Sequence, residues 1–200
     1  AASDVYKRQM QVFELKGELR TDLGKKATKV LREEKKVPCV LYGGKENIHF
    51  SVVEKDLSKL VYTPFVYIVK IMIDGNAYEA VMREIQFHPV TDRILHIDFY
   101  HIFAEKPVII EVPVKLKGFA EGVQAGGKLV QVIRKLKVKA LPANLPGEVE
   151  LDVTSLGLGK SIKVKELSFD NFEVVNAKEV VIAQVKVTRA SKSVEAGDKK

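Results

Sequence analysis

Alternating hydrophobic and polar positions predict a chain built mainly of β-strands. Residues 11–19 alternate well enough for a first strand, and residues 38–42 and 48–52 form two apolar runs separated by a Gly-Gly pair. Residues 65–73 and 77–87 form a second pair, joined by Asp74-Gly75-Asn76. Asp-Gly supplies the positive φ angles of a tight turn, so this pair predicts a β-hairpin. A further strand is predicted over residues 93–103.

Helical periodicity is confined to two short segments of the first half. Residues 54–61 have apolar side chains at positions 57, 60 and 61, typical of a short amphipathic helix. The other segment lies between Gly24 and Pro38, which bracket a predicted helix. At about 100° per residue, four cations fall within a stripe about 60° wide on this helix. They are Lys25, Lys29, Arg32 and Lys36. Ala27, Val30 and Leu31 point the opposite way, so we expect them to pack on a core and leave the cations in solvent.

The pattern changes after the polar, proline-containing segment 104–107. From there on the composition predicts strands without clear helices, over residues 108–116, 129–140, 147–153, 161–164, 172–175 and 180–187. We therefore expect two domains, a β-rich one with two helices over residues 10–103 and a mainly antiparallel β domain over residues 104–189. Residues 1–9 precede Met10 and are expected to be a leader foreign to the native protein, and residues 190–200 a disordered tail.

The net charge of +7 and the isoelectric point of about 9.3 favour an acidic partner. Residues 16–45 carry nine basic against four acidic side chains, which places binding of a nucleic acid ahead of a merely solvated charged surface. No apolar run approaches the ~18 residues of a membrane-spanning helix, so we expect a soluble chain. Cys39 is the only cysteine, which excludes an intramolecular disulfide and a thiolate zinc cluster and fits a reducing cytosol.

Three histidines and one aspartate form the main candidate for chemistry. His88, His96, Asp98 and His101 are close enough in sequence to suggest a metal site or a phosphodiesterase. On a strand, however, only His96 and Asp98 share a face. They can bond to base edges or sugars, or they can pair with each other. No His-Glu-x-x-His element or nucleophile elbow accompanies them.

Tyr42 stands directly before the Gly-Gly pair, and Lys45 follows that pair. A lone tyrosine is usually an aromatic residue at the edge of a core. Its position beside a flexible glycine pair and a lysine also favours stacking on a nucleic acid. Both interpretations stay open on the sequence.

Two segments resemble a known family. GELRTDLGKKATKVLREEKKVPCVLYGGKENIHF and IQFHPVTDRILHIDFYHI resemble the bacterial large-subunit ribosomal protein L25 family, whose members bind 5S rRNA. The specific markers are an Arg before a Gly-Lys loop, the basic helix, Pro-x-x-x-Tyr-Gly-Gly and His-Ile-Asp-Phe. The second half resembles the C-terminal domain of the long form of this family, the general stress protein CTC. The match covers residues 10–189.

The resemblance implies a small N-terminal β-barrel with short helices, similar to the anticodon-binding barrel of glutaminyl-tRNA synthetase. It also implies a cytoplasmic, ribosome-associated, non-enzymatic protein without a cofactor or metal, monomeric when free. Its partners would be loop E of 5S rRNA in the central protuberance and the neighbouring rRNA and ribosomal proteins. Two alternatives are a free RNA-binding stress protein that acts on another structured RNA, and a metal-dependent hydrolase built on His88, His96 and Asp98.

Carried over by position, the implied RNA contacts are Arg20, Lys25, Thr28, Lys29, Arg32, Tyr42, His96 and Asp98. The basic surface adds Lys26, Lys36 and Lys45 to the predicted RNA-binding set. Thr28 stands where the family often has serine, Lys29 where it often has arginine, and Lys26 where many members have glycine. Threonine keeps the hydroxyl, whereas lysine keeps the charge but loses the planar fork of arginine.

Overall fold

The computed structural model describes residues 10–169 and 171–188, and the predicted leader and tail lie outside these ranges. The chain folds as two compact units. The first runs to Ile110 and also includes Leu141–Gly147, and the second comprises Glu111–Ala140 and the chain from Glu148 onward. The bounds 10–103 and 104–189 for the two domains remain a prediction.

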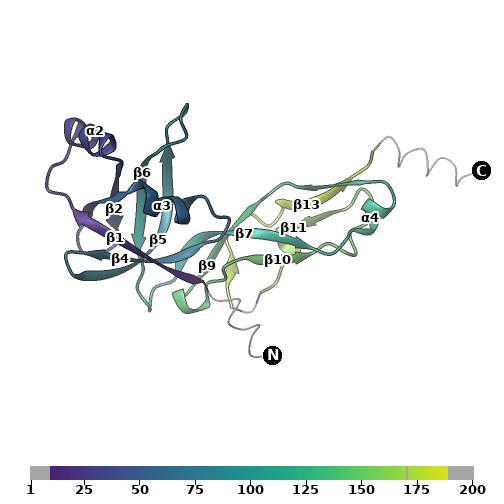
Figure 1. Ribbon diagram of the computed structural model, residues 1–200. Coiled ribbons are helices and arrows are strands. Elements are labelled where there is room, and N and C mark those ends of the chain that lie inside the picture. The colour runs from purple at the N-terminus through teal and green to yellow at the C-terminus, as the bar shows by residue number, and fades with distance from the viewer. Residues whose placement is uncertain (1–9, 170, 189–200) are drawn as a thin grey trace, which may run out of the picture. The chain divides into compact units, whose positions relative to one another are not determined.

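The first unit is a closed six-stranded barrel (Figure 1). Its strands are β1 (Gln11–Leu19), β2 (Lys36–Tyr42), β3 (Ile48–Val53), β4 (Tyr67–Ile73), β5 (Asn76–Phe87) and β6 (Ile94–His101). Around the barrel the order is β1-β3-β2-β6-β5-β4, with β1–β4 and β2–β6 parallel and the other pairs antiparallel. Closure leaves no free sheet edge. The predicted β-barrel is confirmed.

Local sequence signals account for much of this barrel. The first strand has the predicted bounds, and its inward-facing Leu15 is buried. Asp74 and Gly75 both have positive φ, 48° and 82°, so the predicted tight turn between β4 and β5 is confirmed. The core centres on Phe50 and Phe99, which are fully buried with ring centroids 5.8 Å apart.

The two predicted helices are present, but the basic one is shorter than expected. Helix α3 (Glu54–Val61) buries Leu57 and Leu60, as its periodicity predicts. Helix α2 (Lys25–Glu33) ends well before Pro38. Lys35 adopts a positive φ of 59°, and Lys36 already belongs to β2, where it is paired with Val53. Strand pairing therefore overrides the helical pattern at Lys36, and the prediction of four cations on one helix is wrong.

The expected packing of α2 is found for Ala27 and Leu31, which are partly buried, but not for Val30. None of its residues is buried, and Val30, predicted to face the core, is 54% exposed. The partly buried positions are Ala27, Thr28, Leu31 and Arg32. The helix thus turns a mixed side toward the barrel, including one of the predicted cations. A helical wheel based on hydrophobicity alone does not include the hydrogen bonds by which Arg32 attaches this side of α2 to Leu95 on β6.

The second unit is a β domain with two sheets. Its elements are β7 (Val108–Lys117), which begins in the first unit, α4 (Glu121–Gln124), β8 (Lys128–Gln131), β9 (Lys135–Ala140), β10 (Val149–Asp152), β11 (Ser161–Lys163), β12 (Glu173–Val174) and β13 (Val181–Lys186). One sheet has the order β10-β7-β9-β12 and the other β11-β13-β8. Short 3₁₀ turns occupy Pro142–Asn144, in the first unit, and Val164–Glu166.

The predicted mainly antiparallel β domain is confirmed, with β7–β10 as a parallel pair. Two details differ from the expectation. The single strand predicted over residues 129–140 is two strands, β8 and β9, which belong to different sheets. The second unit also contains the short helix α4, where strands without clear helices are predicted.

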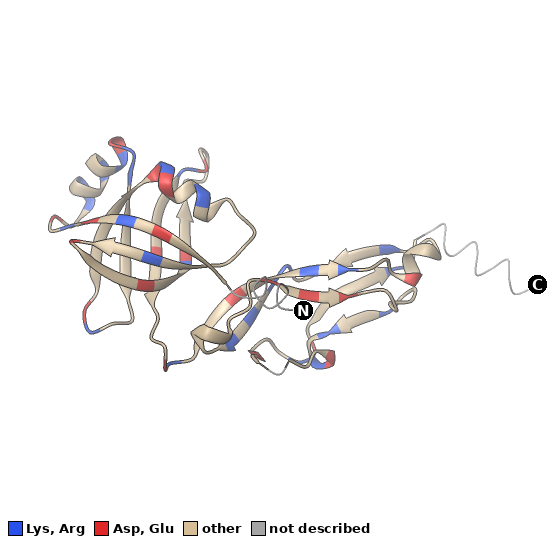
Figure 2. Ribbon diagram, turned by 60° about the horizontal axis from the view of Figure 1, so that its bottom comes forward, with Lys and Arg blue, Asp and Glu red and all other residues tan. Residues whose placement is uncertain are grey.

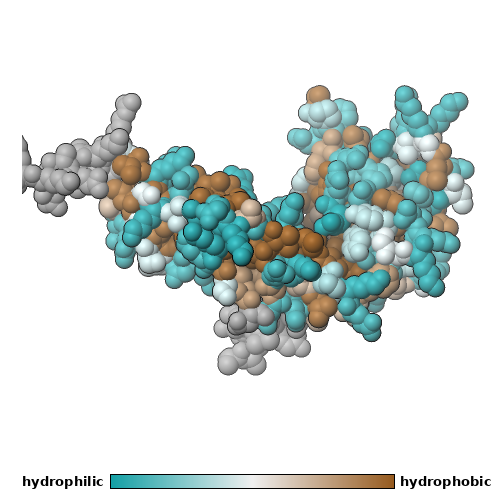
Figure 3. Space-filling model, turned by 180° about the vertical axis from the view of Figure 1, so that it is seen from behind, coloured by the Kyte–Doolittle hydropathy of each residue, from teal (hydrophilic) through white to brown (hydrophobic). Residues whose placement is uncertain are grey.

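Hydrophobic side chains are exposed on both units (Figure 3). Val90, in the loop between β5 and β6, is 83% exposed, and Phe119 in the second unit is 60% exposed. Among the described residues, no helix is long and apolar enough to cross a membrane.

Candidate nucleic-acid interface

Strand register brings residues that are distant in sequence onto one outer face of the barrel. The backbone N–H of Arg20, just after β1, donates to the carbonyl of His49 on β3 at 2.9 Å. His49 is paired with Val40 on β2, and Val40 with Asp98 on β6. Side chains alternate between the two sides of a strand. The chain neighbours of these positions that point inward and are fully buried are Cys39, Phe50 and Ile97. The row from Arg20 to Asp98 therefore faces outward.

His96 and Asp98 pair with each other on this face. His96 Nδ1 lies 2.8 Å from Asp98 Oδ1, and the two side chains are 29% and 30% exposed. This carboxylate fixes the orientation of the imidazole and favours a proton on Nδ1, which leaves Nε2 as the ring's second polar atom. Internal pairing, one of the two interpretations of the sequence, is thus present. It does not remove the pair from contact with a ligand, because both side chains remain partly exposed.

Two tyrosines extend the same face at the ends of β2 and β6. Tyr42 is paired in register with Tyr100, and their rings meet edge to face with centroids 5.5 Å apart. The guanidinium of Arg83 lies 6.0 Å from the centroid of the Tyr100 ring. Tyr42 is only partly buried, so it is an outer aromatic residue rather than part of the barrel core. Gly43 follows with φ of +96°, a conformation that favours glycine.

The cations of α2 differ in their surroundings. Lys25, Lys26 and Lys29 are exposed, and the first turn holds no acidic residue (Figure 2). The hydroxyl of Thr28 lies 3.0 Å from the carbonyl oxygens of Gly24 and of Lys25, so its hydrogen is used inside the helix. The hydroxyl oxygen keeps its capacity to accept a hydrogen bond.

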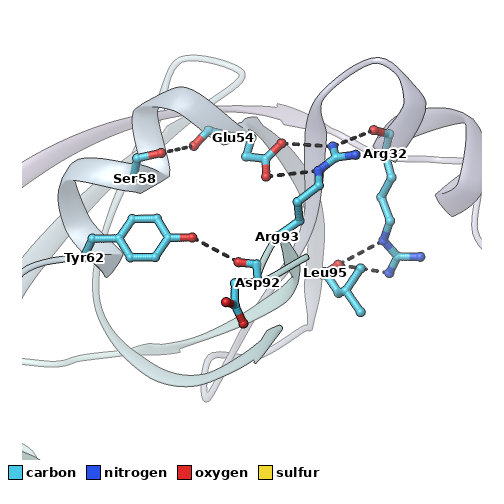
Figure 4. Close-up of polar contacts among 7 residues, drawn as sticks. All are labelled: Arg32, Glu54, Ser58, Tyr62, Asp92, Arg93 and Leu95. Atoms are coloured by element: carbon cyan, nitrogen blue, oxygen red, sulfur yellow. Dashed lines mark hydrogen bonds and ion pairs between the residues drawn. The ribbon is translucent and has the colours of Figure 1, made fainter. Parts of the chain in front are cut away.

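Arg32 does not extend into solvent as predicted. Its Nε and Nη2 both donate to the carbonyl oxygen of Leu95 on β6, at 3.2 and 2.9 Å, where the contact is partly buried (Figure 4). The guanidinium therefore ties the end of α2 to the residue before His96. Nη1 is left for another acceptor, since neither of these bonds uses it.

A second arginine completes this attachment, which we call the α2 clasp (Arg32, Glu54, Arg93 and Leu95). Arg93 Nη2 donates to the backbone carbonyl of Arg32 at 3.2 Å and to Glu54 Oε2 at 3.0 Å, and Nε reaches Glu54 Oε1 at 3.4 Å (Figure 4). The hydrogen bond with Glu54 raises the pKa of Arg93. No local pattern points to Glu54 or Arg93, because Arg93 lies 39 residues from Glu54 and 61 residues from Arg32 along the chain.

The remaining predicted contacts lie beside this surface. Lys36, on β2 rather than α2, forms an ion pair of 2.5 Å with Glu18, and this hydrogen bond raises the pKa of the lysine. Lys45 is exposed in the loop between β2 and β3. Arg20 donates from Nη2 to the carbonyl of Asp22 at 3.2 Å, while its buried Nε has no partner among the described residues.

His88 does not join the His96–Asp98 pair. Nδ1 of His88, in the loop between β5 and β6, accepts from the backbone N–H groups of Val90 and Thr91 at 3.3 Å each. Within residues 10–169 and 171–188, no three His, Cys, Asp or Glu side chains are placed to hold a metal ion. The described structure does not assemble His88, His96 and Asp98 as one site.

The barrel has exposed lysines on a flanking helix and paired His-Asp and Tyr-Tyr side chains on an adjoining outer face. This arrangement is typical of a nucleic-acid-binding protein. Comparison with known proteins specifies the class. Residues 15–99 match the "Ribosomal L25p family", and residues 107–189 match "Ribosomal protein TL5, C-terminal domain". The chain belongs to the ribosomal L25p family.

Relatives are similar over nearly their whole length. The chain is 54% identical over 190 residues to a protein of Phocaeicola vulgatus, a match that covers 92% of this chain and 96% of the relative. It is 55% identical over 185 residues to a protein of Azobacteroides pseudotrichonymphae, covering 92% and 98%. Both relatives are named large ribosomal subunit protein bL25. The resemblance noted from the sequence is confirmed, and a family of ribosomal proteins also confirms the non-enzymatic prediction.

Proposed function

We propose that this chain is a structural constituent of the large ribosomal subunit, and that its first unit binds the loop E region of 5S rRNA in the central protuberance. The family and the names of its relatives support the ribosomal role. The observation that carries the RNA contact is the strand register, which brings Arg20 and Asp98 to one outer face beside α2.

The surface offers two kinds of RNA contact, one to phosphates and one to bases and sugars. The exposed lysines Lys25, Lys26, Lys29 and Lys45 neutralise phosphates and position the protein, which carries no sequence information. The His96–Asp98 pair and Arg20 offer donors and acceptors to base edges or sugars, and Tyr42 offers a ring face for stacking. Regular A-form RNA has a deep, narrow major groove that side chains enter poorly. An irregular internal loop such as loop E, with its non-Watson–Crick pairs, is therefore the suitable target.

The corrected geometry changes the parts played by two predicted contacts. Lys36 is committed to Glu18, so it contributes little to the attraction of phosphates. Arg32 acts first as the link between α2 and β6, and presents only its remaining donors to RNA. We expect Lys29, which is exposed, to be the more direct phosphate contact.

A gel-shift titration of the full chain with 5S rRNA tests this function. Each lost phosphate contact lowers the slope of log affinity against log salt by about 0.7 to 0.9. We expect Lys29→Ala to lower the slope by one such step. Lys70→Ala, on β4 at the opposite side of the barrel order from β2, removes the same charge and should leave the slope unchanged.

The same titration with an altered loop E tests the choice of RNA. Weaker binding to the altered RNA supports the proposal. Equal affinity for both RNAs contradicts it, and equal affinity for an unrelated structured RNA favours a free RNA-binding stress protein instead.

A further inference from the structure

Strand β9 of the second unit carries a row of lysines that the sequence did not single out. Lys135, Lys137 and Lys139 are exposed, and the residues that alternate with them are buried. Leu136 and Val138 are fully buried, and Ala140 is 6% exposed. The hydrophobic side of β9 fixes the strand in the domain, so its three lysines must face outward together. We call them the β9 lysine row.

Acidic residues of the second unit compensate other lysines. Lys115 and Lys117 on β7 pair with Glu148 and Glu150. Glu179 is engaged by both Lys163 and Lys165, at 2.9 and 3.6 Å, and these lysines lower its pKa.

The β9 lysine row lacks such ion pairs within the described part of the chain. Among the residues that the structure describes, none of the three lysines forms an ion pair within 4.0 Å. Glu173 on β12 is opposite Lys139 in register without forming one. Arg134, directly before the strand, is also exposed and adds a fourth cation.

Spacing makes these charges act together. Alternate residues of a strand lie about 6.6 to 6.8 Å apart, which is shorter than the Debye length of about 8 Å at physiological salt. The three ammonium groups therefore repel one another and together form a positively charged row. A linear polyanion relieves this repulsion by following the row.

We propose that the β9 lysine row is a second RNA-binding surface, which contacts the phosphate backbone of ribosomal RNA without reading its sequence. This inference rests on the proposed ribosomal function. RNA fits better than an acidic protein because the centres of protein interfaces are depleted in lysine and enriched in aromatic residues. The exposed side of β9 consists of lysines alone. Lysine is a point charge suited to phosphate rather than to bidentate recognition of a base.

The test uses the full chain and a 23S rRNA transcript in the absence of 5S rRNA. The variant K135Q/K137Q/K139Q removes the row, and K115Q/K117Q/K163Q removes three lysines that are ion-paired. At about 0.7 per contact, we expect the first variant to lower the salt slope by about two. The control variant should change it by much less. Far-UV circular dichroism checks that both variants fold.

Two results would overturn the inference. One is an equal salt slope for the wild type and for K135Q/K137Q/K139Q on 23S rRNA. The other is wild-type binding to polyglutamate as tightly as to 23S rRNA at the same salt, which would show attraction to any acidic polymer. Binding to 5S rRNA separates this inference from the proposed function. Wild type that fails to bind 5S rRNA refutes the first unit's role, whereas K135Q/K137Q/K139Q should bind it normally.

Discussion

Gly43 allows the two outer tyrosines of the barrel to meet, so Gly43→Ala should damage both stability and RNA binding. The residue has φ of +96°, and a Cβ added to it would lie 2.6 Å from Tyr100 Cε2 and 2.9 Å from Tyr100 Cδ2. The ring of Tyr100 cannot yield without leaving Tyr42, against which it packs edge to face. Relief of the clash therefore dismantles the aromatic surface proposed to stack on RNA.

The cost has two parts. Forcing a residue with a Cβ into a left-handed conformation costs about 1–2 kcal/mol. Overpacking against a ring adds about 1–3 kcal/mol. We expect Gly43→Ala to lower the free energy of unfolding of the first unit by about 3.5 kcal/mol, taking both effects at their middle values.

Gly75 provides a matched control. It lies in the turn between β4 and β5 with a similar φ of +82°, but a Cβ there would meet nothing within 4 Å. Gly75→Ala therefore includes the conformational strain without the clash and should cost about 1–2 kcal/mol. The gain from restricting the unfolded chain is the same for both substitutions and cancels in their difference.

Tyrosine fluorescence during urea unfolding measures both variants. The chain has no tryptophan, and all six tyrosines precede residue 101, so the signal reports on the first unit and not on the second. Equal losses of stability for the two variants would refute the reasoning about Tyr100. Unchanged 5S rRNA affinity of Gly43→Ala would refute a role of the tyrosine pair in binding.

Three further predictions concern other residues of the barrel. Glu54→Gln weakens the α2 clasp, so hydrogen exchange of the backbone amides of α2 should become several-fold faster. The affinity for 5S rRNA should fall, while the slope of log affinity against log salt should stay constant. A changed slope would mean that Glu54 affects phosphate contacts directly. Burial lowers the pKa of His101, against an opposing effect of Glu79. As the pH falls, the unfolded chain therefore binds a proton at His101 before the folded chain does, so the midpoint of urea unfolding should fall below about pH 6.5. His101→Asn should remove this pH dependence. A midpoint that rises toward pH 5.5 would contradict a lowered pKa of His101. Burial also raises the pKa of the Cys39 thiol, so a thiol reagent should modify it only on unfolding, and rapid modification of the native chain would contradict the closed barrel.

Sequence reasoning was most reliable where a signal was local. The Asp-Gly turn, the bounds of β1 and the amphipathic helix α3 each depend on residues within a few positions of one another. It was least reliable at Lys36, where the helical pattern of the sequence continues although the residue is paired with β3 as part of β2. Propensity decides such a boundary only where no neighbouring strand competes for the backbone.

The candidate surface was foreseen in its residues but not in its arrangement. Spacing on a strand was enough to align His96 with Asp98, and their 2.8 Å contact follows from that alignment. Nothing local indicated that Arg32 would turn to the carbonyl of Leu95 or that Arg93 would link two helices. The contribution of a side chain to such a clasp depends on partners that only closure of the barrel brings within reach.

By itself the sequence determined the β-rich class, the basic character of the first unit and the set of residues that form its outer face, because hydrophobic alternation, charge and turn chemistry act over short stretches of chain. Only the tertiary structure decided which cations are available. Lys29 and the β9 lysine row remain exposed, whereas Lys36 is taken by Glu18 and Arg32 by a backbone carbonyl. The physical reason is that a charge is neutralised by neighbours in space, and barrel closure sets those neighbours through contacts between residues far apart in the sequence.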